Sequence, residues 1–196
     1  MPDHLGEQLS PIAAPSAAAA ATTRLHIGSF VFANDYRHPL VLARGAATLD
    51  MLSGGRFALG IGAGWNPTDY RKLGVPYDPP VVRVDRLSEA VPLLKRLLAD
   101  ETVDHVGAHY TLNGAAAGIR RDQRPPVPLL IGGGGPRILR LAARETNIVA
   151  LQPQMDPHGR PIVRQATERA TAQKVEILRA ARRAALRGPR DQRDRW

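Results

Sequence analysis

The sequence contains no cysteine, which excludes disulfide bonds, catalytic thiolates and zinc sites built on thiolates. It also has no apolar run that approaches the roughly 18 residues of a membrane span, so no membrane partner is expected. The apolar run at 17–21 is short and has no basic segment before it, which argues against a signal peptide. Together these absences predict a cytoplasmic protein.

Several familiar site signatures are missing as well. The six histidines are scattered along the chain, and no metal centre is expected. There is no G-x-S-x-G motif, no P-loop and no pair of carboxylates spaced for acid–base catalysis. The sequence therefore gives no sign of a serine hydrolase, a P-loop nucleotide hydrolase or a metalloenzyme.

The net charge of +9 is concentrated at one end of the chain. Residues 160–196 carry 11 Lys or Arg against 4 Asp or Glu, whereas the other 159 residues carry 16 against 14. Residues 156–196 are therefore predicted to form a basic tail that is partly helical or disordered. Nucleic-acid binding through this tail is disfavoured but left as an alternative, and it predicts a salt-dependent DNA affinity that disappears when residues 160–196 are deleted.

Two apolar segments run directly into glycine-rich sequence. The segment 56–62 alternates large and small residues as a strand does, and Gly62 and Gly64 follow at its end. The segment 128–131 is a second apolar strand, and four consecutive glycines at 132–135 follow it. Strand ends of a parallel sheet meet at one edge. The sequence thus predicts an α/β fold in which both glycine loops border one pocket.

The remaining segments fit the same pattern of alternating strands and helices. Parallel strands are predicted at 24–32, 56–62, 127–131 and 147–151, and a small β-hairpin at 102–112. Helices are predicted at 10–21, 39–53, 82–98 (with Pro92 inside), 136–145 and 167–186. An irregular excursion is predicted at 65–80, an irregular connector at 114–126 and a disordered end at 188–196.

Short motifs along most of the chain resemble one known family. In order they are DHLG at 3–6, LHIGS at 25–29, YRHP at 36–39, AATLDMLSGGRF at 46–57, GIGAGW at 60–65, RVDRL at 83–87, PLLIGGGG at 128–135 and IVAL at 148–151. The sequence is similar in these stretches to the luciferase-like flavin and deazaflavin oxidoreductases, above all to the branch that uses the deazaflavin coenzyme F420. The run 49–65 is the most specific part of this match.

The resemblance implies a TIM barrel, of the (β/α)8 type, that binds coenzyme F420 at its C-terminal face and transfers a hydride to or from a small organic substrate. A monooxygenase that uses reduced FMN is the alternative. The resemblance assigns His4 a catalytic role. It also implies a cis peptide bond in the segment 29–31. The residues implied to contact the coenzyme are Ser29, Phe30, Val31, Gly62, Ala63, Gly64, Trp65, Gly132, Gly133, Gly134 and Gly135.

A full barrel of this type needs eight strands and about 250 residues. Only four to five parallel strands are expected here, so the chain is predicted to be the middle of a barrel, cut at both ends. Residues 1–155 would form this partial barrel domain and 156–196 the tail. A catalytically inactive remnant and a homodimer are both left open.

Each candidate residue also has a plainer interpretation. His4 could be a frayed terminal residue instead of an acid or base near the coenzyme. Gly62 and Gly64 could be turn glycines, and the glycines at 132–135 could form a flexible turn instead of a phosphate site at a helix start. The charged residues Arg83, Asp85 and Arg86 are expected to form ion pairs.

Overall fold

The structure, a computed structural model, describes residues 1–119, 126–156 and 158–187. The predicted disordered end at 188–196 and part of the connector before Pro126 lie outside these residues. The helices are α1 (Ala13–Ala21), α2 (Pro39–Ser53), α3 (Pro67–Leu73), α4 (Pro80–Leu98), α5 (Pro136–Glu145) and α6 (Glu168–Arg187). The strands are β1 (Ile27–Gly28), β2 (Phe32–Ala33), β3 (Phe57–Gly62), β4 (Val103–Val106), β5 (Thr111–Ala115), β6 (Leu129–Gly133) and β7 (Ile148–Leu151). Two short 3-10 turns are η1 (Asn34–Tyr36) and η2 (Val163–Gln165).

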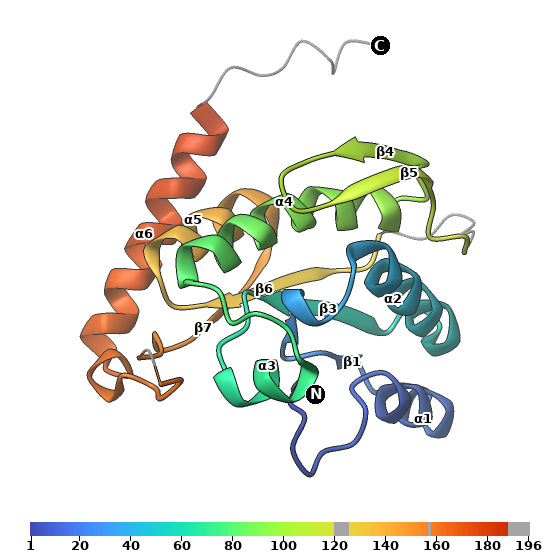
Figure 1. The fold of residues 1–196 in the computed structure, drawn as a ribbon, viewed down its shortest axis with the longest axis horizontal. Coiled ribbons are helices and arrows are strands. Elements are labelled where there is room, and N and C mark those ends of the chain that lie inside the picture. The colour runs from blue at the N-terminus through green and yellow to red at the C-terminus, as the bar shows by residue number, and fades with distance from the viewer. Residues whose placement is uncertain (120–125, 157, 188–196) are drawn as a thin grey trace.

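A parallel sheet with β3 at its centre organises the fold (Figure 1). Both β1 and β2 pair with one side of β3, and β6 pairs with its other side through Leu59↔Leu129 and Ile61↔Ile131. Next to β6 lies β7, also parallel. The strands follow one another across the sheet in chain order with helices between them, which is the arrangement of a (β/α) barrel. The predicted partial barrel of four to five parallel strands is confirmed.

The predicted strand at 24–32 is divided into β1 and β2 because the chain leaves the sheet between them. Ser29 lies over β3, where its hydroxyl donates to the Gly60 carbonyl at 2.9 Å and accepts from the Gly60 amide at 2.8 Å. A side chain at Gly60 would collide with the Ser29 carbonyl. The peptide bond between Phe30 and Val31 is cis, in the segment where the resemblance implied one.

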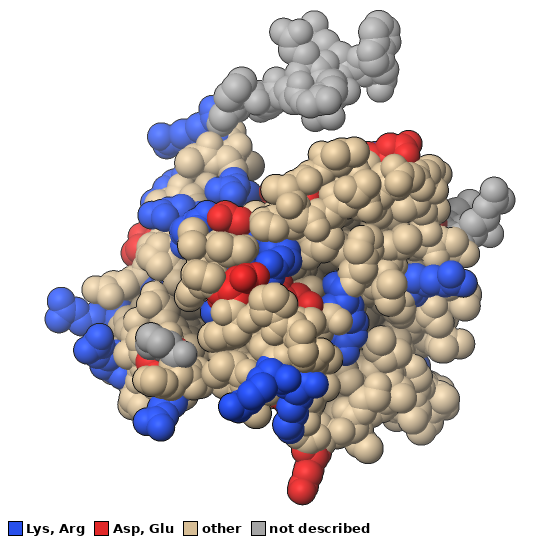
Figure 2. All heavy atoms as spheres, in the orientation of Figure 1, with Lys and Arg blue, Asp and Glu red and all other residues tan. Residues whose placement is uncertain are grey.

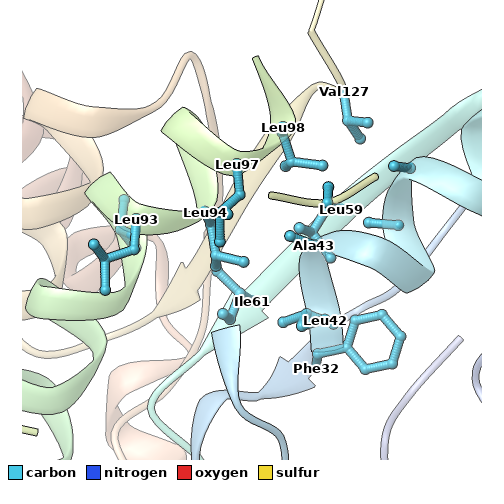
Figure 3. Close-up of a cluster of buried hydrophobic side chains, with 14 of the residues drawn as sticks. Phe32, Leu42, Ala43, Leu59, Ile61, Leu93, Leu94, Leu97, Leu98 and Val127 are labelled. Atoms are coloured by element: carbon cyan, nitrogen blue, oxygen red, sulfur yellow. The ribbon is translucent and has the colours of Figure 1, made fainter. Parts of the chain in front are cut away.

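The apolar core lies between the sheet and the helices α2 and α4 (Figure 3). Leu59 and Ile61 of β3 are fully buried beneath these helices. The close-up shows side chains from α2, β3 and α4 gathered together, among them Leu42, Ala43, Ile61, Leu94 and Leu97. Each buried leucine of this kind contributes about 1.5–3 kcal/mol relative to an exposed one, so this layer holds the strands in register.

The segment 65–80 is not wholly irregular, and that prediction was wrong. It contains α3, a two-turn helix that begins after Asn66 and ends at Gly74. The Asn66 side chain accepts from the Thr68 amide at 3.1 Å, Pro67 occupies the first helical position, and Gly74 adopts a left-handed conformation with φ 69°. These are ordinary start and stop signals. They were present in the sequence but enclose a helix too short to show an apolar periodicity.

The predicted hairpin is confirmed as the antiparallel pair β4–β5, which packs beside α4. Glu89 of α4 connects this helix to the hairpin. Its carboxylate accepts from the backbone amides of His109 and Tyr110 at 3.0 and 2.9 Å and lies 3.0 Å from Nε2 of His105. Burial opposes ionisation of Glu89, but the hydrogen bonds from His105, Tyr110 and His109 outweigh it and lower the pKa of the carboxyl.

The last described helix, α6, packs against α5. Lys174 donates to the carbonyls of Gln152 and Gln165 at 2.8 and 3.2 Å, and Arg182 donates to the carbonyl of Ala143 at 3.1 Å. Figure 2 shows Lys and Arg side chains gathered along the edge of the molecule over α6. Among the described residues, the helices are all too short or too polar to span a membrane.

Candidate functional site

A cavity of about 640 Å³ opens at the carboxyl ends of the parallel strands. This volume lies within the range of about 300–1,000 Å³ that is usual for small-molecule sites. Its wall combines strand ends, the first turns of α4 and α5, and the N-terminal segment. Its lining residues include Asp3, His4, Phe30, Val31, Gly62, Ala63, Gly64, Trp65, Arg83, Gly132, Gly133, Gly134, Gly135, Arg137 and Gln154.

The structure brings almost all the predicted site residues together around this cavity. His4, the pair Phe30–Val31, the segment 62–65 and the glycines 132–135 all line it. The two glycine-rich strand ends are neighbours because β3 and β6 pair directly. Ser29 lies apart from the lining: its side chain is buried and engaged with the backbone of Gly60.

The glycines at the strand ends serve the packing of the protein itself. A Cβ at Gly62 or Gly132 would lie about 3.0 Å from the side chain of Val31, and one at Gly133 would overlap Ile138. Gly64 has φ 72°, and Tyr70 lies directly beneath it. Glycine at these positions lets Val31, Ile138 and Tyr70 pack directly against the backbone. Gly135 differs, because a Cβ there would meet only Gln154 at 3.9 Å.

His4 is held in place by a buried carboxylate. Its Nδ1 lies 2.7 Å from Oδ2 of Asp69, and its ring packs edge-on against Trp65 with centroids 4.9 Å apart. Asp69 also accepts from the Leu5 amide at 3.2 Å and from the Asn66 side chain at 2.8 Å. A carboxylate on Nδ1 leaves Nε2 of the imidazole as the atom available to a ligand. The segment around His4 is therefore anchored and not frayed.

The residue before His4 forms a second anchor. Asp3 is buried and makes a two-pronged ion pair with Arg37 at 2.6 and 2.9 Å, and it also accepts from the Ala33 amide at 3.0 Å. This geometry matches the planar guanidinium to the carboxylate. It fixes the N-terminal segment against η1 and the end of β2.

Helix α5 begins at the cavity. Gly135 precedes it without any side-chain cap, and Pro136 occupies its first position. The early amides of a helix have no partners within the helix, and its N-terminus carries a partial positive charge. This end of α5 is suited to an anionic group such as a phosphate. Arg137, in the same turn, pairs with Asp85 at 2.5 Å and is half exposed.

Behind the cavity wall lies a buried polar cluster that the sequence did not reveal. Asp35 accepts from the Tyr70 hydroxyl at 2.9 Å and pairs with Arg86 at 2.8 Å. Burial, reinforced by nearby carboxylates, raises the pKa of Tyr70 and of Tyr36 well above the usual tyrosine range. The Tyr70 hydroxyl therefore stays protonated as the donor to Asp35.

Of the three charged residues expected in ion pairs, Arg86 and Asp85 have them. Arg83 does not: it forms no ion pair with any residue that the structure describes, so that prediction was wrong for this residue.

Asp69 and Asp35 were missed altogether. Asp69 sits in the first turn of α3, so recognising the Asn66–Pro67 helix start would have drawn attention to it. Over the described ranges no cluster of His, Asp or Glu could hold a metal ion.

Comparison with known families adds evidence independent of this geometry. The family model described as luciferase-like monooxygenase matches residues 1–193. The chain belongs to this family. The family resemblance predicted from the motifs is confirmed.

Curated relatives are more than a third identical to this chain over the aligned stretches. It is 38% identical to the F420-dependent glucose-6-phosphate dehydrogenase of Kineococcus radiotolerans, over 64% of this chain and 37% of that protein. It is 37% identical to the 4-hydroxyprotoasukamycin monooxygenase of Streptomyces nodosus subsp. asukaensis, over 65% of this chain and 34% of that protein. The chain thus spans less than two fifths of the length of these two relatives.

A solved structure supports the fold. The coenzyme F420 dependent tetrahydromethanopterin reductase from Methanopyrus kandleri superposes with a TM-score of 0.77 at 23% identity, over 95% of this chain and 53% of that protein. At this identity the likeness concerns the fold alone. It confirms that the parallel sheet of this luciferase-like chain corresponds to part of a barrel.

Proposed function

We propose that this chain contributes the coenzyme site of an oxidoreductase that transfers a hydride between coenzyme F420 and a small organic substrate. One observation carries the proposal: the two glycine-rich strand ends and the uncapped start of α5 border a single cavity that also receives His4. The F420-dependent relative of Kineococcus radiotolerans supports the choice of coenzyme.

The residues present fit such a coenzyme. The cavity is large enough for a ring system, and the open space at Gly135 lets a phosphate approach the first amides of α5. When bound, the deazaflavin supplies the hydride chemistry, and the protein supplies orientation and electrostatics. Phe30, Val31 and the backbone at 62–65 would face the ring.

Within this scheme His4 moves a proton. The carboxylate of Asp69 fixes the imidazole through Nδ1, so Nε2 can take a proton from a substrate hydroxyl or return one. Trp65 covers one edge of the imidazole and narrows the access of water to it. The remaining residues assigned to the site act through shape and backbone amides, not by exchanging protons.

A monooxygenase that uses reduced FMN is the second candidate. The similarity to the 4-hydroxyprotoasukamycin monooxygenase favours it specifically. Both coenzymes combine a tricyclic ring with a phosphorylated side chain, so both suit a cavity with one phosphate end. Binding measurements must therefore decide between them.

The decisive experiment is a titration of the 196-residue chain with each coenzyme, followed by fluorescence quenching. We expect saturable quenching with coenzyme F420 and at least about tenfold weaker binding of FMN. The reverse order would support the monooxygenase. If neither coenzyme binds at high micromolar concentration, the chain alone is an inactive remnant of the site and the proposal fails.

The proposal also covers the domain organisation, the cellular location and the oligomeric state of the protein. Residues 1–155 would act as the partial barrel domain and 156–196 as an accessory tail, although α6 is fastened to α5. The protein would work in the cytoplasm on a small molecule and not on nucleic acid. A homodimer is proposed as its assembled form.

A further inference from the structure

Arg83 is buried and has no ion-pair partner among the residues that the structure describes. It lies in the first turn of α4 and is only 5% exposed. Its Nε and Nη1 atoms are inaccessible to water and have no hydrogen-bond partner among the described residues. A buried donor that lacks an acceptor costs about 1–3 kcal/mol, and more when it is charged. A function of Arg83 in binding would explain why the protein tolerates this free-energy cost.

The surrounding carboxylates are already engaged. Asp35 and Asp78 both pair with Arg86, at 2.8 and 2.5 Å, and Asp85 pairs with Arg137. Asp3, the carboxylate in the cavity wall, pairs with Arg37. The guanidinium of Arg83 therefore has no direct ion-pair partner within the part of the chain that the structure describes. Asp35 and Asp78 together carry one more charge than Arg86 balances, so the local field favours the cation without binding it directly.

Aromatic rings hold this guanidinium in position. Its Cζ lies 4.1 Å from the centroid of the Tyr77 ring and 5.8 Å from that of Tyr70. Stacking of this kind stabilises a cation without neutralising it. Tyr77 is fixed in turn, because its hydroxyl donates to the Trp65 carbonyl at 2.9 Å. The side chain is thus preorganised, and it forms part of the cavity wall.

We infer that Arg83 binds an oxyanion, a carboxylate or a phosphate, of the molecule that occupies the cavity. This inference rests on the proposed function for the identity of the site but adds a requirement: the ligand carries a negative charge beside the start of α4. A guanidinium is the protein group best matched to such an anion. Because Nε and Nη1 are inaccessible to water, an anion in the cavity would bind through Nη2. The start of α5 already offers a place for the phosphate of the coenzyme, so Arg83 is assigned to the small-molecule substrate.

The test compares anion binding in Arg83→Met with that in the wild-type chain and in Arg86→Met. Acetate and inorganic phosphate are the anionic probes, acetamide is the neutral match for acetate, and the readout is the rise in Tm with probe concentration. Wild type should respond to both anions. Without anion, R83M should be at least as stable as the wild-type chain. Its affinity for acetate should be about tenfold or more lower than that of wild type, as expected for a lost charged hydrogen bond.

Arg86→Met is the matched control, because Arg86 lies one turn further along α4 and does not line the cavity. This substitution leaves the carboxylates of Asp35 and Asp78 without their ion-pair partner. The Tm of R86M should therefore be lower than that of wild type at every anion concentration, but it should still rise as anion is added. Equal responses of R83M and wild type to acetate and phosphate would overturn the inference. If R83M does not fold, Arg83→Gln replaces it with the same expected loss.

A parallel titration with coenzyme F420 separates the two sources of the anion. If the substrate supplies it, R83M binds the coenzyme within about twofold of wild type, and saturating coenzyme leaves the acetate response of wild type intact. If the coenzyme tail occupies Arg83, R83M loses coenzyme affinity instead, and the assignment to the substrate is overturned. An anion response that depends on Arg83 in a chain that binds no coenzyme would refute the proposed function and leave the anion site standing.

Discussion

Gly60 shows how closely the segment 29–31 packs on the sheet. A Cβ at this position would overlap the Ser29 carbonyl, whereas one at Gly45 in the middle of α2 would make an ordinary 3.6 Å contact with Ile12. We expect Gly60→Ala to destabilise the fold by about 3 kcal/mol or more through overpacking. Gly45→Ala should stabilise it by about 0.5–1 kcal/mol through helix propensity. Urea unfolding measures both, and equal effects would contradict the close approach at Gly60.

Asp69 is the residue that fixes the orientation of His4. Asp69→Asn replaces one acceptor oxygen by a donor, so one of the three hydrogen bonds to this side chain must be lost. We expect a loss of about 1–3 kcal/mol in unfolding free energy and a mixture of His4 tautomers in nitrogen-detected NMR spectra. Asp85→Asn, in an exposed pair with Arg137, is the control and should cost less than about 1 kcal/mol. A wild-type-like tautomer in D69N would show that Asp69 does not position His4.

For single residues, the sequence correctly predicted which of them border the cavity. It did not predict the packing contacts that explain why glycine stands there. The pattern of a strand followed by glycine correctly placed 62–65 and 132–135 at one edge of the sheet. The expected reason was room for a ligand, but Val31, Ile138 and Tyr70 fill the space beside most of these glycines. Such contacts join residues distant in sequence, and no local pattern encodes them. The unpaired state of Arg83 was hidden for the same reason.

Among the elements, the β4–β5 hairpin depends most on a titrating group. The pKa of Glu89 is lowered from its ordinary value of 4.5 in the folded chain, so the carboxylate stabilises the fold above that pH. This contribution is lost as the pH falls below 4.5 through the folded-state pKa. We expect Glu89→Gln to unfold less steeply with acid than wild type between about pH 5 and 3. Chemical denaturation across that range measures the difference, and parallel acid curves would refute it.

Element boundaries were predictable where local chemistry determines them. Pro39 and Gly54 enclose α2, and Pro136 and Glu145 enclose α5, as the sequence predicted. α4 continues through Pro92, which is exposed, because tertiary packing of its leucines outweighs the local penalty. The division of the first strand into β1 and β2 accompanies the hydrogen bonds between the Ser29 side chain and Gly60 of β3, a long-range contact that periodicity does not report.

For the molecule as a whole, the outer edge of β7 is one surface suited to association. No strand among the described residues pairs with that edge, and Ile148 on it is 42% exposed. Exposed sheet edges promote pairing between chains, and a lysine on the edge opposes it. We expect the 21.2 kDa chain to self-associate in sedimentation experiments, and Ile148→Lys to shift it toward monomer. Arg179→Lys, on exposed α6, should leave the association unchanged. A wild-type chain that stays monomeric at all concentrations would contradict this.

The packed interior and the cavity lie side by side and share Ile138. Leucines of α2, β3 and α4 fill the space between sheet and helices (Figure 3), while the cavity opens beyond the strand tips. The same architecture could therefore acquire new ligand preferences through changes in the loops at the strand tips while its scaffold stays unchanged.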